Sequence, residues 1–170
     1  MALKRDKLFA LRIGEYALDV TTNVDDYSGG YPCQITADGV ARVNGELQVT
    51  NHAQFIGILA NSRTTDLKTG KVTFYIPPVI LDLYSGDLGV YGGDQGVPTG
   101  EGKPYLTGGD PYVEGSQITI VHAAGADNGK WRVAATTEIV YGLVLALTGA
   151  TANAPDSLTV LFNSRTYASA

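Results

Sequence analysis

Two apolar runs near the end of the chain, Ile139–Leu147 (IVYGLVLAL) and Ser157–Phe162 (SLTVLF), decide the fold class. Both are rich in β-branched and large aliphatic residues, and both have the length of a buried strand. Between them, Thr148–Asp156 (TGATANAPD) has the composition of a turn. These residues predict two neighbouring antiparallel strands in an all-β protein.

Two more strands are predicted immediately upstream of this pair. Gln117–Val121 (QITIV) and Lys130–Ala134 (KWRVA) have β-branched or aromatic residues in short runs. Asp127-Asn128-Gly129 precedes the second run, and Asn-Gly is a strong hairpin signal because glycine accepts positive φ. We therefore expect a hairpin here.

An earlier part of the chain, from Asp38 to Pro78, repeats this organisation. Asn44-Gly45 predicts a two-residue hairpin turn. Pro77-Pro78 ends the last strand of the repeat, because proline cannot donate a hydrogen bond into a ladder. The segments expected around these signals are strands at Phe55–Ala60, Lys71–Ile76 and Val79–Tyr84, with a polar turn at Thr64–Gly70.

The fold class that follows is all-β, a compact sandwich or small barrel of short antiparallel strands, because each strand pair must bury one face against another layer. An N-terminal arm and a long glycine-rich loop are added to it. We expect Leu3–Ile13 to be a short helix or extended arm and Tyr16–Val20 to be the first strand. The predicted organisation is an arm and first strand at 1–37, and a β domain at 38–170 made of two similar units, 38–84 and 110–167, joined by the glycine-rich loop 85–109.

Composition narrows the classes of function. Twelve Lys and Arg against seventeen Asp and Glu give a net charge of −5, which argues against a nucleic-acid partner because phosphate binding needs cations. A hydrophobic content of 44% is enough for a core. One cysteine, Cys33, rules out an internal disulfide and a cysteine-based zinc site. No apolar run reaches the length that spans a membrane.

A search for reactive groups yields no convergent motif. The carboxylates near the glycine-rich loop have no spacing that favours an acid–base pair or a calcium loop. His52 and His122 are the two histidines, and each stands at the end of a predicted strand, where a backbone hydrogen bond is the usual role. We therefore expect no enzyme activity, no catalytic residue, no cofactor and no metal. A small β-enzyme built around one of the histidines is the competing hypothesis.

Basic and aromatic residues are better candidates for binding a partner. The N-terminal segment is positively charged on an acidic protein, which suits contact with an acidic neighbour, and loop tyrosines often anchor interfaces. The predicted partner-binding residues are Lys4, Arg5, Lys7, Phe9, Tyr91 and Tyr105. Trp131 and several tyrosines on one sheet face would instead indicate a carbohydrate-binding β module.

Part of the chain resembles a known family. Gly109–Gly115 (GDPYVEG), Val140–Leu145, the turn Thr148–Pro155 and Leu158–Phe162 resemble, in this order, the strand-and-turn pattern of tailed-bacteriophage capsid decoration proteins, also called cement proteins. Asp38–Ile76 resembles the pattern more loosely, and together the similarity covers about half of the chain. Tyr112-Val113 stands where the family often has Val-Tyr, and the hairpin around Asn128 is an addition.

The resemblance implies a structural virion protein. Such a protein binds the outer surface of an icosahedral phage head and stabilises the capsid lattice by bridging neighbouring capsomers. The implied partners are the major capsid protein and sister subunits, in a homotrimer, with no nucleic acid and no membrane. The implied location is the capsid surface of the virion, after assembly in the host cytoplasm. Another virion component, such as a tail or fibre protein, is the alternative.

Overall fold

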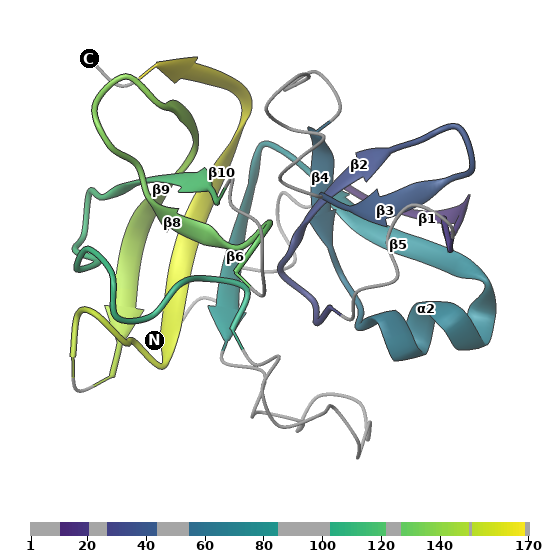
Figure 1. Ribbon diagram of the computed structural model, residues 1–170, viewed down its shortest axis with the longest axis horizontal. Coiled ribbons are helices and arrows are strands. Elements are labelled where there is room, and N and C mark those ends of the chain that lie inside the picture. Colours follow the sequence, from purple (N-terminus) through teal and green to yellow (C-terminus); the bar gives the residue numbers. More distant parts are fainter. Residues whose placement is uncertain are drawn as a thin grey trace.

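The protein folds as a β-sandwich. The computed structural model describes residues 11–20, 27–43, 55–84, 103–121, 127–149 and 151–168. Within them lie ten strands and one short helix, and the strands form two five-stranded antiparallel sheets that pack together (Figure 1). The prediction of an all-β fold is confirmed.

The first sheet has the strand order β1-β5-β4-β2-β3 and curls towards closure. A parallel bridge joins Leu18, just beyond one edge strand, to Val40 in the other. The backbone N–H of Asp19 also donates to the carbonyl of Val40 at 3.0 Å. Closure needs a glycine at position 39, where φ is +145° and a Cβ would lie 2.4 Å from the carbonyl oxygen of Ala17. The strands are β1 (Leu11–Ala17), β2 (Pro32–Ile35), β3 (Val40–Arg42), β4 (Phe55–Leu59) and β5 (Lys71–Ile76).

The curled sheet encloses its own apolar cluster, and the helix α2 (Arg63–Thr69) lies beside it (Figure 1). Residues 64–70 are thus mainly helical, which corrects the prediction of a polar turn there. The side chain of Ser62 caps the helix by accepting from the N–H of Thr65, and Gly70 ends it in the left-handed conformation. The enclosed cluster consists of Leu18, Tyr27, Tyr31, Cys33, Val40, Leu59, Val72 and Phe74.

The second sheet has the order β6-β10-β9-β7-β8. The two apolar runs Ile139–Leu147 and Ser157–Phe162 lie in β9 and β10, which pair antiparallel with Ser157 opposite Thr148 and Phe162 opposite Gly142. β7 pairs antiparallel with β8, so the predicted hairpin is present. Its turn is not the Asn128-Gly129 dipeptide, because the N–H of Gly129 donates to the carbonyl of Val121 and residues 122–128 connect the two paired ends. The strands are β6 (Val79–Tyr84), β7 (Gln117–Ile120), β8 (Trp131–Val133), β9 (Ile139–Thr148) and β10 (Ser157–Ala168).

The two sheets divide the chain at a different place from the two predicted units. The first sheet takes strands from residues 11–76 and the second takes strands from 79–168. Pro77-Pro78 interrupts the ladder, so Val79–Tyr84 leaves the first sheet and pairs with β10. β1 includes Leu11–Ile13, which had been predicted as part of the N-terminal arm, and it ends at Ala17. The first strand therefore begins and ends earlier than the predicted Tyr16–Val20. The Asn44-Gly45 turn lies outside the described residues.

The main core lies between the two sheets. It combines Val43 and Ile58 from the first sheet's side with the inner face of the second sheet. Trp131 is at its centre, with its ring 4.9 Å from that of Phe162 and 6.2 Å from that of Phe55, between ring centroids. Because one apolar cluster contains residues of both sheets, separating the sheets would expose this cluster to water.

Candidate functional site

Polar contacts cross the boundary between the sheets and fix their relative position. The indole N–H of Trp131 donates to the carbonyl of Gly30 at 2.7 Å. The Arg42 guanidinium, whose residue is only 6% exposed, donates to the carbonyl of Asn128 and stacks 4.2 Å from the centroid of the Tyr31 ring. We call these contacts, made by Gly30, Tyr31, Arg42, Asn128 and Trp131, the inter-sheet seam. Buried hydrogen bonds of this kind favour a single arrangement of the two sheets, because breaking them would leave buried polar groups without a partner and without water.

The described end of the predicted glycine-rich loop is part of the packed structure. The N–H of Leu106 donates to Trp131 and that of Trp131 to Pro104, both at 2.8 Å, so this segment extends the second sheet beyond β8. The Lys103 ammonium donates to the carbonyl of Pro155 at 2.9 Å. Residues 103–106 are therefore held by the core, while 85–102 lie outside the described residues.

Tyr105 is a core residue, which corrects its prediction as a partner-binding residue. It is 1% exposed, and its hydroxyl donates to the carbonyl of Pro155 at 3.0 Å. Its ring packs edge-on against Tyr112, with 5.9 Å between the centroids. Burial, followed by the nearby carboxylate of Asp156, raises the pKa of Tyr105 above its usual range. The neighbouring glycines and prolines made the segment look like an exposed loop, and only the pairing with β8 reveals the burial.

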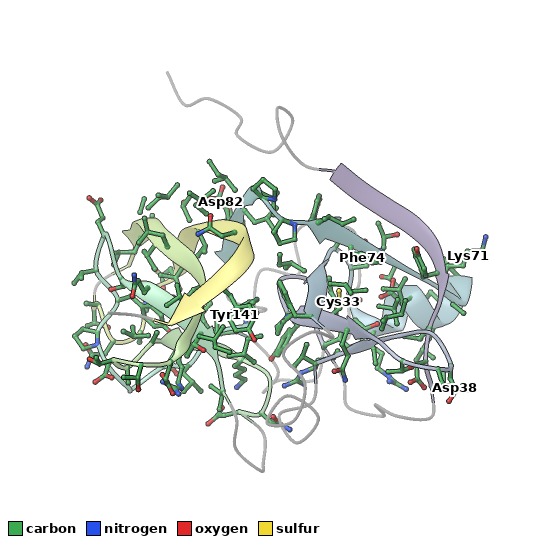
Figure 2. All side chains as sticks on the ribbon, turned by 90° about the horizontal axis from the view of Figure 1, so that it is seen from above. Cys33, Asp38, Lys71, Phe74, Asp82 and Tyr141 are labelled. Atoms are coloured by element: carbon green, nitrogen blue, oxygen red, sulfur yellow. The ribbon has the colours of Figure 1, made fainter. Side chains whose placement is uncertain are left out.

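Trp131 and the tyrosines packed around it are too deeply buried to form a sugar-binding platform. Trp131 is 0% exposed, and Tyr31, Tyr112 and Tyr141 are also buried. A platform needs ring faces that reach solvent, so the feature that would have indicated a carbohydrate-binding module is absent among these residues. Tyr141, labelled in Figure 2, comes from β9 of the second sheet.

A buried polar cluster links α2 to the interior of the first sheet. The Asp66 carboxylate, fully buried, accepts from the Tyr27 hydroxyl at 2.8 Å and from the Asn61 amide at 3.3 Å. Burial, together with this carboxylate, raises the pKa of Tyr27 above its usual range. Burial likewise raises the pKa of the Cys33 thiol, with Asp66 adding to the effect, so the thiol is protonated and unreactive. These contacts hold α2 against the first sheet, which is a structural role.

One hollow of about 420 Å³ lies beside β8. Arg132 at its wall is held in a two-point ion pair with Glu138, one arm of which measures 2.8 Å between Nη1 and Oε2. The Tyr112 hydroxyl is also engaged, within 3.1 and 3.2 Å of the carbonyls of Leu106 and Trp131. The hollow's polar side chains are thus largely committed to the protein itself. Its lining is Leu106, Gly108, Gly109, Asp110, Tyr112, Arg132 and Val133.

The remaining predicted binding residues and the two histidines lie outside the described residues. These are Lys4, Arg5, Lys7, Phe9, Tyr91, His52 and His122. In the part of the chain that is described, no group of three or more His, Cys, Asp or Glu side chains could hold a metal ion. The same residues contain no helix long and apolar enough to cross a bilayer.

The chain matches no protein-family model, no curated protein and no solved structure.

Proposed function

We propose that this chain is a structural virion protein that binds the outer surface of an icosahedral phage head and stabilises the lattice by bridging neighbouring capsomers. The proposal rests on the resemblance of Gly109–Gly115, Val140–Leu145 and Leu158–Phe162 to capsid decoration proteins. In this proposal the major capsid protein is the partner, the active form is a homotrimer, and binding rather than catalysis is the activity.

The inter-sheet seam is the structural observation that supports this proposal. A module that bridges two capsomers transmits force between them, so it must resist shear between its own two halves. Here Trp131 and Arg42 tie the sheets across a shared core. A ligand that binds the assembled lattice more tightly than free subunits stabilises that lattice by mass action, and several simultaneous contacts strengthen the effect.

Sedimentation with phage heads tests the proposal. Purified protein is mixed with expanded, empty heads and with unexpanded heads, and the pelleted fraction is measured at increasing protein concentration. We expect saturable binding to expanded heads, at a ratio fixed by the lattice, together with a raised temperature of head disruption. Non-saturable or absent binding to the heads of every phage tested would contradict the proposal.

The N-terminal arm can be tested in the same assay. Because β1 begins at Leu11, a deletion of residues 1–10 spares the strand. A triple alanine variant of Lys4, Arg5 and Lys7 removes the positive charge alone. Both should weaken head binding while the circular dichroism spectrum stays unchanged. Alanine at the exposed Lys68 and Lys71 removes two positive charges elsewhere and is the control for a general loss of charge, and equal weakening by the control would argue against the arm.

A further inference from the structure

The turn Asp127–Lys130 contains the dipeptide Asn-Gly. Asparagine is most prone to deamidation before glycine, because glycine has no side chain to hinder attack by its backbone nitrogen on the asparagine side chain. The N–H of Lys130 donates to the carbonyl of Asp127 at 3.1 Å, and Gly129 has φ +74°. Thr137 is the one non-glycine of the described residues with positive φ, so Asn128 has negative φ. Negative φ at Asn128 followed by positive φ at Gly129 is the combination found in type II turns.

The peptide group between Asn128 and Gly129 is pinned at both of its polar atoms. Its oxygen accepts from the Arg42 guanidinium, which comes from the first sheet. Its N–H donates to the carbonyl of Val121 at 3.1 Å. A Cβ on Gly129 would lie 2.3 Å from the carbonyl oxygen of Val43, so the main chain is also packed closely against the first sheet. This peptide group is therefore held by both sheets at once.

Deamidation requires this peptide group to move. The nitrogen of Gly129 attacks Cγ of Asn128 and gives up its proton, ammonia leaves, and a five-membered succinimide ring forms. Water then opens the ring at either carbonyl, giving aspartate or isoaspartate. Closing the ring turns the peptide group about the Cα–C bond of Asn128, which takes its oxygen away from Arg42 and its nitrogen away from Val121.

We propose that Asn128 is a deamidation site whose reaction is prevented by the inter-sheet seam. The hydrogen bond from Arg42 keeps the peptide group between Asn128 and Gly129 in its unreactive position. While the sheets are packed, the asparagine is preserved. When the seam opens, the side chain reacts, and a permanent negative charge is left in the turn beside Asp127. The inference concerns this turn alone and holds whether or not the protein binds a phage head.

The test follows deamidation at Asn128 by peptide mass spectrometry, as the mass gain of one dalton over time in mildly alkaline buffer. Wild type, Arg42→Met and Arg132→Ala are compared while folded and again in denaturant. Arg42→Met keeps an apolar stem over Tyr31 but removes the donor. Arg132→Ala is the matched control, because Arg132 contacts Glu138 and not the turn.

We expect folded wild type to react more slowly than the denatured chain. Arg42→Met should react about tenfold faster than folded wild type, the factor that corresponds to losing one buried hydrogen bond to a charged donor. Arg132→Ala should match wild type, and all three should react equally in denaturant, where Asn44-Gly45 serves as an internal reference. Should Arg42→Met fail to fold, wild type in denaturant just below its unfolding transition replaces it, and acceleration there is expected. Equal rates in folded and denatured wild type, or an unchanged rate in folded Arg42→Met, would overturn the proposal.

Discussion

Replacing Trp131 by phenylalanine tests whether the two sheets form one unit. The indole N–H donates to the carbonyl of Gly30 at 2.7 Å, and the ring lies at the centre of the core shared by both sheets. Phenylalanine keeps an aromatic ring there but has three fewer ring atoms, and the donor nitrogen is one of the three. The variant therefore weakens the seam and the core between the sheets while leaving the strand pairing of each sheet in place.

The expected loss of stability follows from these two terms. Leaving the Gly30 carbonyl without its partner costs about 1–3 kcal/mol. The smaller ring gives up buried apolar surface and leaves a void, which costs about 1–2 kcal/mol more. The sum is about 2–5 kcal/mol. For a chain of this length each kcal/mol shifts the melting temperature by about 2–4 °C, so Tm should fall by roughly 4–20 °C.

Urea unfolding followed by circular dichroism measures this change. Wild type and variant should each show a single transition with the same slope, because residues of both sheets share one cluster. Tyr16→Phe is the control, since Tyr16 is exposed and the substitution keeps its ring contact with Phe74. A loss smaller than about 1 kcal/mol, or two separate transitions in wild type, would refute the argument that the sheets are one unit.

Three further outcomes are expected. Burial raises the pKa of Tyr27, Tyr105 and Tyr112 in the folded state. Their contribution to the free energy of unfolding should therefore be fully present below pH about 10 and should be lost as the pH rises above it. A urea midpoint that stays constant from neutral to strongly alkaline pH would contradict this. Thr137→Asn should raise the free energy of unfolding by about 0.5–1 kcal/mol, because a β-branched residue at φ +80° is strained and asparagine tolerates it, whereas no gain is expected for Thr136→Asn. Gly57→Ala should lower the free energy of unfolding by more than about 2 kcal/mol, since its Cβ would lie 2.2 Å from the Tyr75 carbonyl oxygen. The control Gly109→Ala should lower it little, because a Cβ there has nothing within 4 Å. Equal losses of stability in calorimetry would show that the close approach at Gly57 is unimportant.

Local sequence was a good guide to most strands. Lys71–Ile76 and Val79–Tyr84 are strands with the predicted bounds, because each is a short β-branched run bounded by turn residues. The helix was missed because it has only seven residues and too few turns for a periodic pattern. Its signals were Ser62 and Gly70 at the two ends. Its docking depends on Asp66 reaching Tyr27, a partner 39 residues away, which no local pattern contains.

The sequence by itself determined that the chain is all-β, since alternation, β-branching and turn residues act over a few neighbouring positions. Only the tertiary structure decided which strands share a sheet, that Tyr105 and Trp131 are core residues, and that Arg42 meets Asn128. These outcomes depend on contacts between residues far apart in the chain, where burial and hydrogen-bond geometry, rather than residue type, select one pairing from many.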